Sequence, residues 1–131
     1  MGGHPYDYVV DYDENLQAAL DRIRADVFER GQYYGADRRP KSPEAAVKAS
    51  GETGTRSILD ITRVQAKPDF CRAAALTREE MLRYFGTETP TLELVRDTEA
   101  FWMDLERGMA RCVVVVEGGM KKLLFAGYSF D

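Results

Sequence analysis

The sequence has few of the residues on which metal sites and disulfide frameworks depend. Its 131 residues include one histidine and two cysteines, and no Cys-x-x-Cys pair is present. A structural zinc site needs about four such ligands, so this chain cannot complete one alone. Two cysteines are also too few to indicate a disulfide framework. We therefore expect reduced thiols at Cys71 and Cys112, no cofactor and no metal.

Long apolar runs and targeting signals are also missing. The densest apolar run, Cys112 to Val116, has the length of a strand and falls far below the ~18 residues that a membrane helix requires. The first residues lack both the basic start and the apolar segment of a secretory signal. These absences predict a protein of the cytoplasmic, bacterial type without a membrane partner.

Motifs for nucleophilic catalysis and for phosphate loops are absent as well. No Gly-x-Ser-x-Gly elbow occurs, and His4 lies close to the start of the chain. The glycine-rich residues 51–57 precede a predicted strand, whereas a P-loop leads from a strand into a helix. Catalysis by Ser-His or Cys-His is therefore disfavoured. Transfer chemistry that relies on Arg, Tyr, Glu and Asp stays open.

Charge is unevenly distributed along the chain. The net charge is −4, yet residues 36–67 hold seven basic and four acidic side chains. Overall acidity argues against a nucleic-acid partner, because such affinity rests on many neutralised phosphates. A local site for a small anionic ligand in the basic middle segment remains compatible with this distribution.

The first half of the chain predicts a strand and two helices. Residues 6–12 alternate aromatic or apolar side chains with polar ones, as a half-buried strand does. Asp13 can cap a helix with an apolar stripe from Leu16 to Val27, and Gly31 can end it. A short helix is expected between Ser42 and Gly51.

The second half predicts another strand, two helices and a hairpin. Residues 57–64 are rich in β-branched side chains and favour a strand. Thr77 and Glu80 have the spacing of a capping box, which predicts a helix up to Gly86. A fourth helix is expected over residues 90–108. Gly118-Gly119 has the composition of a hairpin turn that pairs Val116 with Lys121, Val114 with Leu123 and Cys112 with Phe125.

These elements define the predicted fold class. The order β-α-α-β-α-α-β-β predicts a single α+β domain over residues 1–131, with a mostly antiparallel sheet of about four strands and a C-terminal β-hairpin. Both faces of the valine-rich strand 112–116 are apolar. We therefore expect that strand to be covered on both sides.

A candidate contact surface lies in the loop after the first long helix. Aromatic rings beside arginines are common at recognition surfaces, because they combine rigid apolar area with directed hydrogen bonds. The candidate residues are Tyr33, Tyr34, Arg38, Arg39 and Arg56. An equally weighted alternative interpretation is that one ring folds back over the preceding helix and that the charges belong to solvated loop residues.

Two functions fit this surface. The first is a small binding protein, such as an inhibitor, an immunity-type protein or an adaptor, that docks on a protein partner. The alternative is a transferase-type enzyme that holds a nucleotide or phosphate ligand with the basic segment 38–56. Asp60 is expected to face solvent on an edge strand, or else to pair with Arg63 or Arg56.

Overall fold

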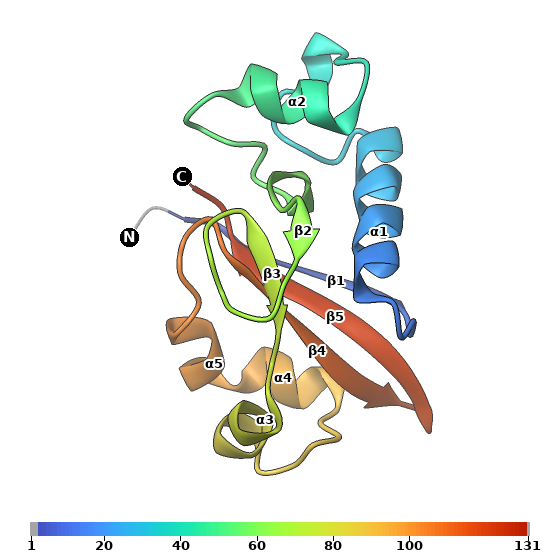
Figure 1. Cartoon of the computed structure of the whole chain (residues 1–131), viewed down its shortest axis with the longest axis vertical. Helices are drawn as coiled ribbons and strands as arrows, with labels where there is room; N and C mark the ends of the chain where they lie inside the picture. Colours follow the sequence, from blue (N-terminus) through green and yellow to red (C-terminus); the bar gives the residue numbers. More distant parts are fainter. Residues whose placement is uncertain (1–2, 131) are drawn as a thin grey trace.

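The structure, a computed structural model, describes residues 3–130. A five-stranded sheet of order β1-β5-β4-β3-β2 forms its middle layer. Figure 1 shows α1 and α2 on one side of this sheet and α3, α4 and α5 on the other. The strands are β1 (Pro5–Asp11), β2 (Arg63–Val64), β3 (Arg72–Ala75), β4 (Ala110–Glu117) and β5 (Met120–Tyr128). The helices are α1 (Leu16–Arg30), η1 (Ala36–Arg38), α2 (Pro43–Ser50), η2 (Ile58–Asp60), α3 (Arg78–Phe85), α4 (Leu92–Asp97) and α5 (Glu99–Met103), where η marks a 3-10 turn.

The prediction of a mostly antiparallel sheet of about four strands was wrong. The sheet has five strands and is mixed: β1, β5 and β4 pair antiparallel, whereas β4, β3 and β2 pair parallel. Between β3 and β4 the chain passes through α3, α4 and α5, which form the crossover that parallel neighbours require. The protein remains α+β in composition.

The missed strand is β3, Arg-Ala-Ala-Ala. Alanine is depleted in strands, so its sequence carries no strand signal. Ala73 and Ala74 are nonetheless fully buried, because β3 lies between β2 and β4 in the sheet. Tertiary packing therefore decides the conformation here.

The strand predicted for residues 57–64 is confined to Arg63–Val64. The preceding residues form the η2 turn, in which the Ser57 hydroxyl accepts the Leu59 N–H at 3.2 Å. In a strand, Ile58 and Leu59 would point to opposite faces; in this turn both are buried in the same cluster.

The first strand and the first three helices of the prediction are confirmed. The cap of α1 is Asn15, whose side chain accepts the Ala18 N–H, whereas Asp13 accepts the N–H of Asn15. Gly31 ends α1 in the left-handed conformation, at φ 66°. Ser42 caps α2, and the complete capping box opens α3.

The fourth helix is shorter than predicted and divided. Thr91 caps α4, and the chain turns at Thr98, whose backbone is extended at φ −84° and ψ 93°. The Thr98 hydroxyl donates to the Leu94 carbonyl at 2.6 Å, a local bond that competes with helix continuation. The second piece, α5, ends at Met103, well before Gly108.

The hairpin prediction is confirmed in its register. Val116 faces Lys121, Val114 faces Leu123 and Cys112 faces Phe125. Gly118 and Gly119 both have positive φ, as this tight turn requires. The second strand, β5, also pairs with β1 on its other side, from Pro5 opposite Tyr128 to Asp11 opposite Lys122.

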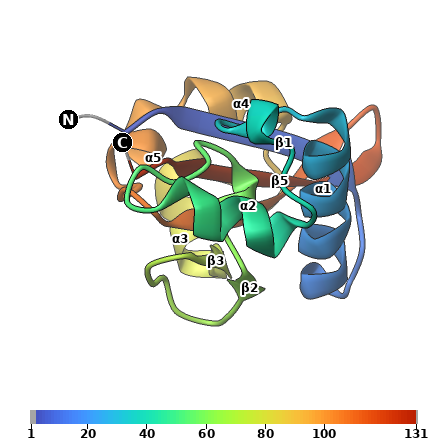
Figure 2. The same cartoon turned by 90° about the horizontal axis from the view of Figure 1, so that it is seen from above.

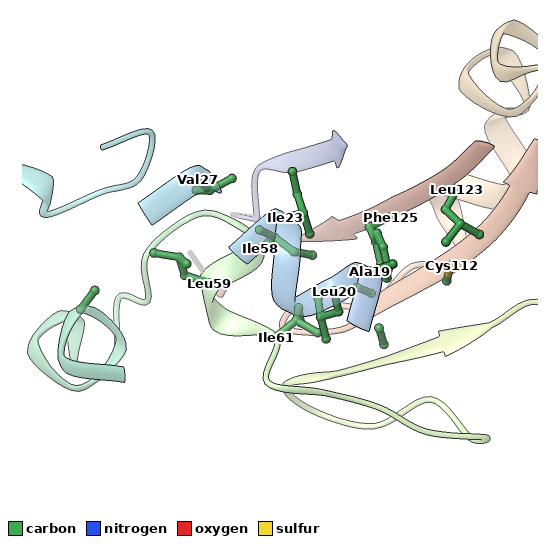
Figure 3. Packing of buried hydrophobic residues seen from close by; sticks show 13 residues of the cluster. Ala19, Leu20, Ile23, Val27, Ile58, Leu59, Ile61, Cys112, Leu123 and Phe125 are labelled. Atoms are coloured by element: carbon green, nitrogen blue, oxygen red, sulfur yellow. The ribbon is translucent and has the colours of Figure 1, made fainter. Parts of the chain in front are cut away.

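Each face of the sheet has its own apolar cluster. On the α1 side, residues of α1 and η2 pack against β4 and β5, and Figure 3 shows Leu20 and Ile23 pointing toward Phe125. On the other side, Phe85 and Phe101 pack against Val113 and Leu124. The expectation that the valine-rich strand is covered on both faces is therefore confirmed. Within residues 3–130, no helix is long and apolar enough to cross a membrane.

Candidate functional site

The structure brings two of the five predicted site residues into direct contact. The loop after α1 runs beside the loop before η2, where the Tyr34 N–H donates to the Thr55 carbonyl at 2.8 Å. The Arg56 guanidinium then lies over the Tyr34 ring, with its central carbon 4.5 Å from the ring centroid. Tyr34 is 43% exposed. An exposed cation–π pair thus joins residues that are 22 positions apart in the sequence.

Arg38 lies beside this pair. Its Nη1 donates to the Ala49 carbonyl at 3.3 Å, which ties η1 to the end of α2. Arg38 and Tyr34 also line a cavity of about 30 Å³ together with Gly54. This volume corresponds to about one water molecule, whereas pockets for drug-sized ligands measure roughly 300–1,000 Å³.

Tyr33 and Arg39 are placed differently. The Tyr33 ring stacks on Phe28 at 5.9 Å and packs against the α1-side cluster. One of the two predicted tyrosines therefore folds back over the helix, as the alternative interpretation held. Arg39 is exposed at the end of η1, and its side chain makes no hydrogen bond or ion pair with any residue between 3 and 130.

Two aromatic residues extend this surface, and sequence reasoning did not connect them. The Phe70 and Phe130 rings stack at 4.9 Å with an interplanar angle of 18°. A Cβ atom on Gly54 would lie 2.5 Å from the Phe130 ring, and one on Gly108 would lie 2.4 Å from Phe70. The rings therefore occupy space that is open only because Gly54 and Gly108 have no side chain. Gly54 also lines the small cavity beside Tyr34. Phe70 is 55% exposed.

We call this surface the cationic–aromatic face. It is formed by Tyr34, Arg38, Arg56, Phe70 and Phe130. Its chain segments are the loops on either side of α2, the loop between β2 and β3, and residues next to β5; Figure 1 and Figure 2 show that the loops around α2 lie at one end of the molecule, above the sheet. Composition suggested the arginines and Tyr34, whereas no local pattern in the sequence indicated Phe70.

Backbone strain is concentrated on the cationic–aromatic face. Within residues 3–130, three residues other than glycine have positive φ: Arg39 at 51°, Arg56 at 55° and Cys71 at 62°. Arg56 belongs to the face, and Arg39 and Cys71 directly follow its residues Arg38 and Phe70. Such conformations cost about 1–3 kcal/mol each and cluster at functional sites.

A buried carboxyl group supports the face from below. Asp60 is 2% exposed, so the expectation that it faces solvent was wrong. Its Oδ1 accepts the Thr55 N–H at 2.8 Å and the Thr55 hydroxyl at 2.9 Å, and the Arg56 N–H is also directed at this carboxyl group. The side chain therefore holds the turn of residues 54–56 from which the Arg56 side chain projects.

The carboxyl group of Asp60 forms no ion pair with the side chain of Arg63 or Arg56, the two partners predicted from the sequence. Its Oδ2 has no hydrogen-bond partner in the described part of the chain, and neither do two nearby buried atoms, the Tyr6 hydroxyl and Arg24 Nε. Burial is the largest influence on Asp60 and raises the pKa of its carboxyl group. Burial, and then the charge of Asp60, raises the pKa of Tyr6 well above its ordinary value.

Burial raises the pKa of both cysteine thiols. Cys71 and Cys112 are free thiols, and burial raises the pKa of Cys112 to about 12, which suppresses the reactive thiolate. In the span from residue 3 to residue 130, no three His, Cys, Asp or Glu residues are grouped so that they could hold a metal ion.

Comparison with known proteins adds no family to this description. No family model, no curated protein and no solved structure matches the chain.

Proposed function

We propose that the protein is a small binding protein of the inhibitor, immunity or adaptor kind, which docks on an acidic protein partner through the cationic–aromatic face. The observation that carries this proposal is the exposed Arg56–Tyr34 pair, built on a strained turn that a buried carboxyl group holds in place. Arginine and aromatic residues dominate the binding energy of protein interfaces.

The positive charge of the face indicates what kind of partner it would bind. The arginines of the face belong to a segment, residues 36–67, with seven basic and four acidic side chains, in a chain whose net charge is −4. A basic patch on an acidic protein is attracted to an acidic surface and orients the encounter. The partner should therefore present Asp or Glu side chains around an apolar centre that covers Phe70 and Phe130.

The cavity in this segment disfavours the nucleotide alternative. A volume of about 30 Å³ leaves no room for a base or a sugar, and Arg38, the arginine that lines this cavity, is exposed. Docking of a protein surface requires no such cavity. The proposal places the protein in the cytoplasm, because two unpaired thiols suit a reducing compartment.

Capture and reconstitution test the proposal. The tagged chain is used to isolate partners from its native host, and a captured protein is then purified and titrated against the wild-type chain by calorimetry. We expect a stoichiometric complex whose affinity falls with salt. The double variant Tyr34→Ala/Arg56→Glu should weaken binding about 30-fold or more, the loss of an interface hot spot.

Arg78→Glu is the matched control, because Arg78 is an exposed, ion-paired arginine on α3, on the opposite side of the sheet. It should change the affinity less than about threefold. Failure to recover any stoichiometric partner would contradict the proposal, as would equal effects of the two charge reversals.

A further inference from the structure

A groove opens on the opposite face of the sheet, between β1 and the helices α4 and α5. Its volume is about 470 Å³, within the range of small-molecule pockets. It is lined by Pro5, Tyr6, Asp7, Arg96, Trp102 and Tyr128. None of these residues belongs to the cationic–aromatic face, so the groove is a separate feature of the molecule.

The groove exists because the helices stop short of the edge strand. On the α1 side, Tyr6, Tyr8 and Val10 of β1 pack against the apolar cluster. On the other side, the cluster under α3, α4 and α5 takes its sheet residues from β4 and β5. The face of β1 that carries Asp7 and Val9 is left outside this cluster, and Val9 is 38% exposed.

The aromatic wall of the groove is held in one orientation. Trp102 Nε1 donates to the Val95 carbonyl at 3.2 Å, which fixes the indole against α4. The Tyr128 ring meets Trp102 edge to face, with centroids 6.3 Å apart and an interplanar angle of 82°. A ring that enters the groove therefore finds aromatic surface that needs no rearrangement.

The polar edge of the groove is equally fixed. Arg96 donates from Nε to Asp7 Oδ2 at 3.2 Å and from Nη2 to Asp7 Oδ1 at 2.8 Å. Arg96 Nη1 and the Tyr128 hydroxyl make no hydrogen bond within residues 3–130. The arginine thus keeps a donor beside carboxylate oxygens that can accept further bonds, and the two charges cancel.

We propose that this groove binds a planar, uncharged heteroaromatic ring with a hydrogen-bond donor and an acceptor side by side on its edge, the chemistry of nucleobases. The aromatic wall favours a flat ring, since stacking on aromatic side chains is tolerant of ring identity. The Arg96–Asp7 pair offers a donor next to an acceptor. Because that pair is neutral, it gives no advantage to a carboxylate or a phosphate.

The single tryptophan of the chain is Trp102, so its fluorescence and its indole N–H resonance report on the groove directly. The probes are adenine and cytosine, compared with indole, which lacks the acceptor, and with benzoate, which carries a charge. We expect the two bases to bind with dissociation constants of about 1 mM or lower, as small ligands of this size do. Indole and benzoate should bind at least about tenfold more weakly.

Two variants separate the polar edge from the aromatic wall. Arg96→Met keeps the length of the side chain and removes its donors, so binding of adenine should weaken about tenfold or more, whereas the control Arg78→Met should change it less than about twofold. Asp7→Asn removes the carboxylate that is hydrogen-bonded to Arg96 and leaves only the weaker influence of Glu117, so it should shift the preference toward benzoate.

Opposite results would overturn the proposal. It fails if neither base perturbs the Trp102 signals at about 10 mM, tenfold above the expected dissociation constant. Indole or benzoate binding as tightly as the bases would contradict the role of the polar edge. An unchanged preference in Asp7→Asn would contradict the argument from charge.

Discussion

Asp60 and Glu80 are carboxyl groups on opposite sides of the sheet that are held by different kinds of donor. Asp60 meets the neutral N–H and hydroxyl groups of Thr55, and one of its oxygens has no partner in the described chain. Glu80 meets the Arg111 guanidinium through two bonds of 2.7 and 2.9 Å and also accepts the Thr77 N–H.

The two environments move the carboxyl pKa values in opposite directions. Burial raises the pKa of Asp60, whereas the hydrogen bond from Arg111 lowers the pKa of Glu80. The comparison shows that a carboxyl group can anchor an irregular turn at an electrostatic cost, or anchor a helix start with an electrostatic gain. Glu80 anchors the start of α3, and Asp60 supports the proposed binding face.

The largest expected effect is the loss of the Asp60 anchor. Asp60→Ala leaves the buried N–H and hydroxyl of Thr55 without an acceptor and should lower the free energy of unfolding by about 3 kcal/mol. Urea denaturation measures this change. Asp26→Ala, which removes an exposed carboxyl group of α1, is the control and should change stability by about 0.5 kcal/mol or less. Equal effects of the two substitutions would show that Asp60 anchors nothing.

On the other side of the sheet, Glu80→Ala should cost about 2 kcal/mol. The substitution removes half of the capping box of α3 and leaves the largely buried Arg111 without its counter-charge. The same denaturation experiment measures it, with the exposed neighbour Glu79→Ala as the control. A loss no larger than that of the control would mean that Arg111 finds another partner.

The pH dependence should distinguish the two carboxyl groups by sign. A raised pKa means that the folded state binds more protons than the unfolded state, so the contribution of Asp60 falls as the pH rises from its ordinary value of 3.8 through the folded pKa. Stability of Asp60→Asn relative to wild type should therefore increase over that window.

Glu80 has a lowered pKa, so its contribution is complete above its ordinary value of 4.5 and is lost as the pH falls through the folded pKa. The free energy of unfolding of Glu80→Gln should therefore fall relative to that of wild type as the pH rises to 4.5, and the difference should stay constant at higher pH. Denaturation curves between about pH 3 and pH 8 give both differences. Slopes of the same sign for the two variants would refute the contrast.

The smallest predicted effect concerns the strained backbone that Asp60 supports. Arg56→Gly and Arg56→Ala both remove the contact with Tyr34, but only glycine relieves the positive φ of this position. The glycine variant should therefore be more stable than the alanine variant by about 1 kcal/mol. Thermal unfolding measures the difference. At Arg22, inside α1, the same pair of substitutions should give the opposite order.

Sequence reasoning succeeded where a signal and its consequence lie close together in the chain. The capping box of Thr77 and Glu80 needs residues three positions apart, and the Gly118-Gly119 turn sets the register of the strands next to it. Helices with a clear cap and a clear end were found for the same reason.

The failures have a common physical cause, which is burial decided by distant partners. Residues 57–64 have the composition of a strand. Residues 58–60 nonetheless form a 3-10 turn, in which the buried Asp60 accepts hydrogen bonds from Thr55. The alanines of β3 become a strand because β2 and β4 lie on either side. Composition pointed to Tyr34 and Arg56, but their pairing depends on the bond from Tyr34 to Thr55, and the stack of Phe70 on Phe130 joins segments that no local pattern relates.

The position of β5 has a consequence for the order of assembly during synthesis. Of the described elements this strand is the last to be synthesised, yet it lies between β1, the first of them, and β4. Until it emerges, neither cluster has Phe125 or Leu124, and β1 has no strand to pair with. Because contacts between distant segments slow folding, a nascent chain that has not released residues 120–128 should expose the apolar faces of α1 and of α3 to α5 to chaperones.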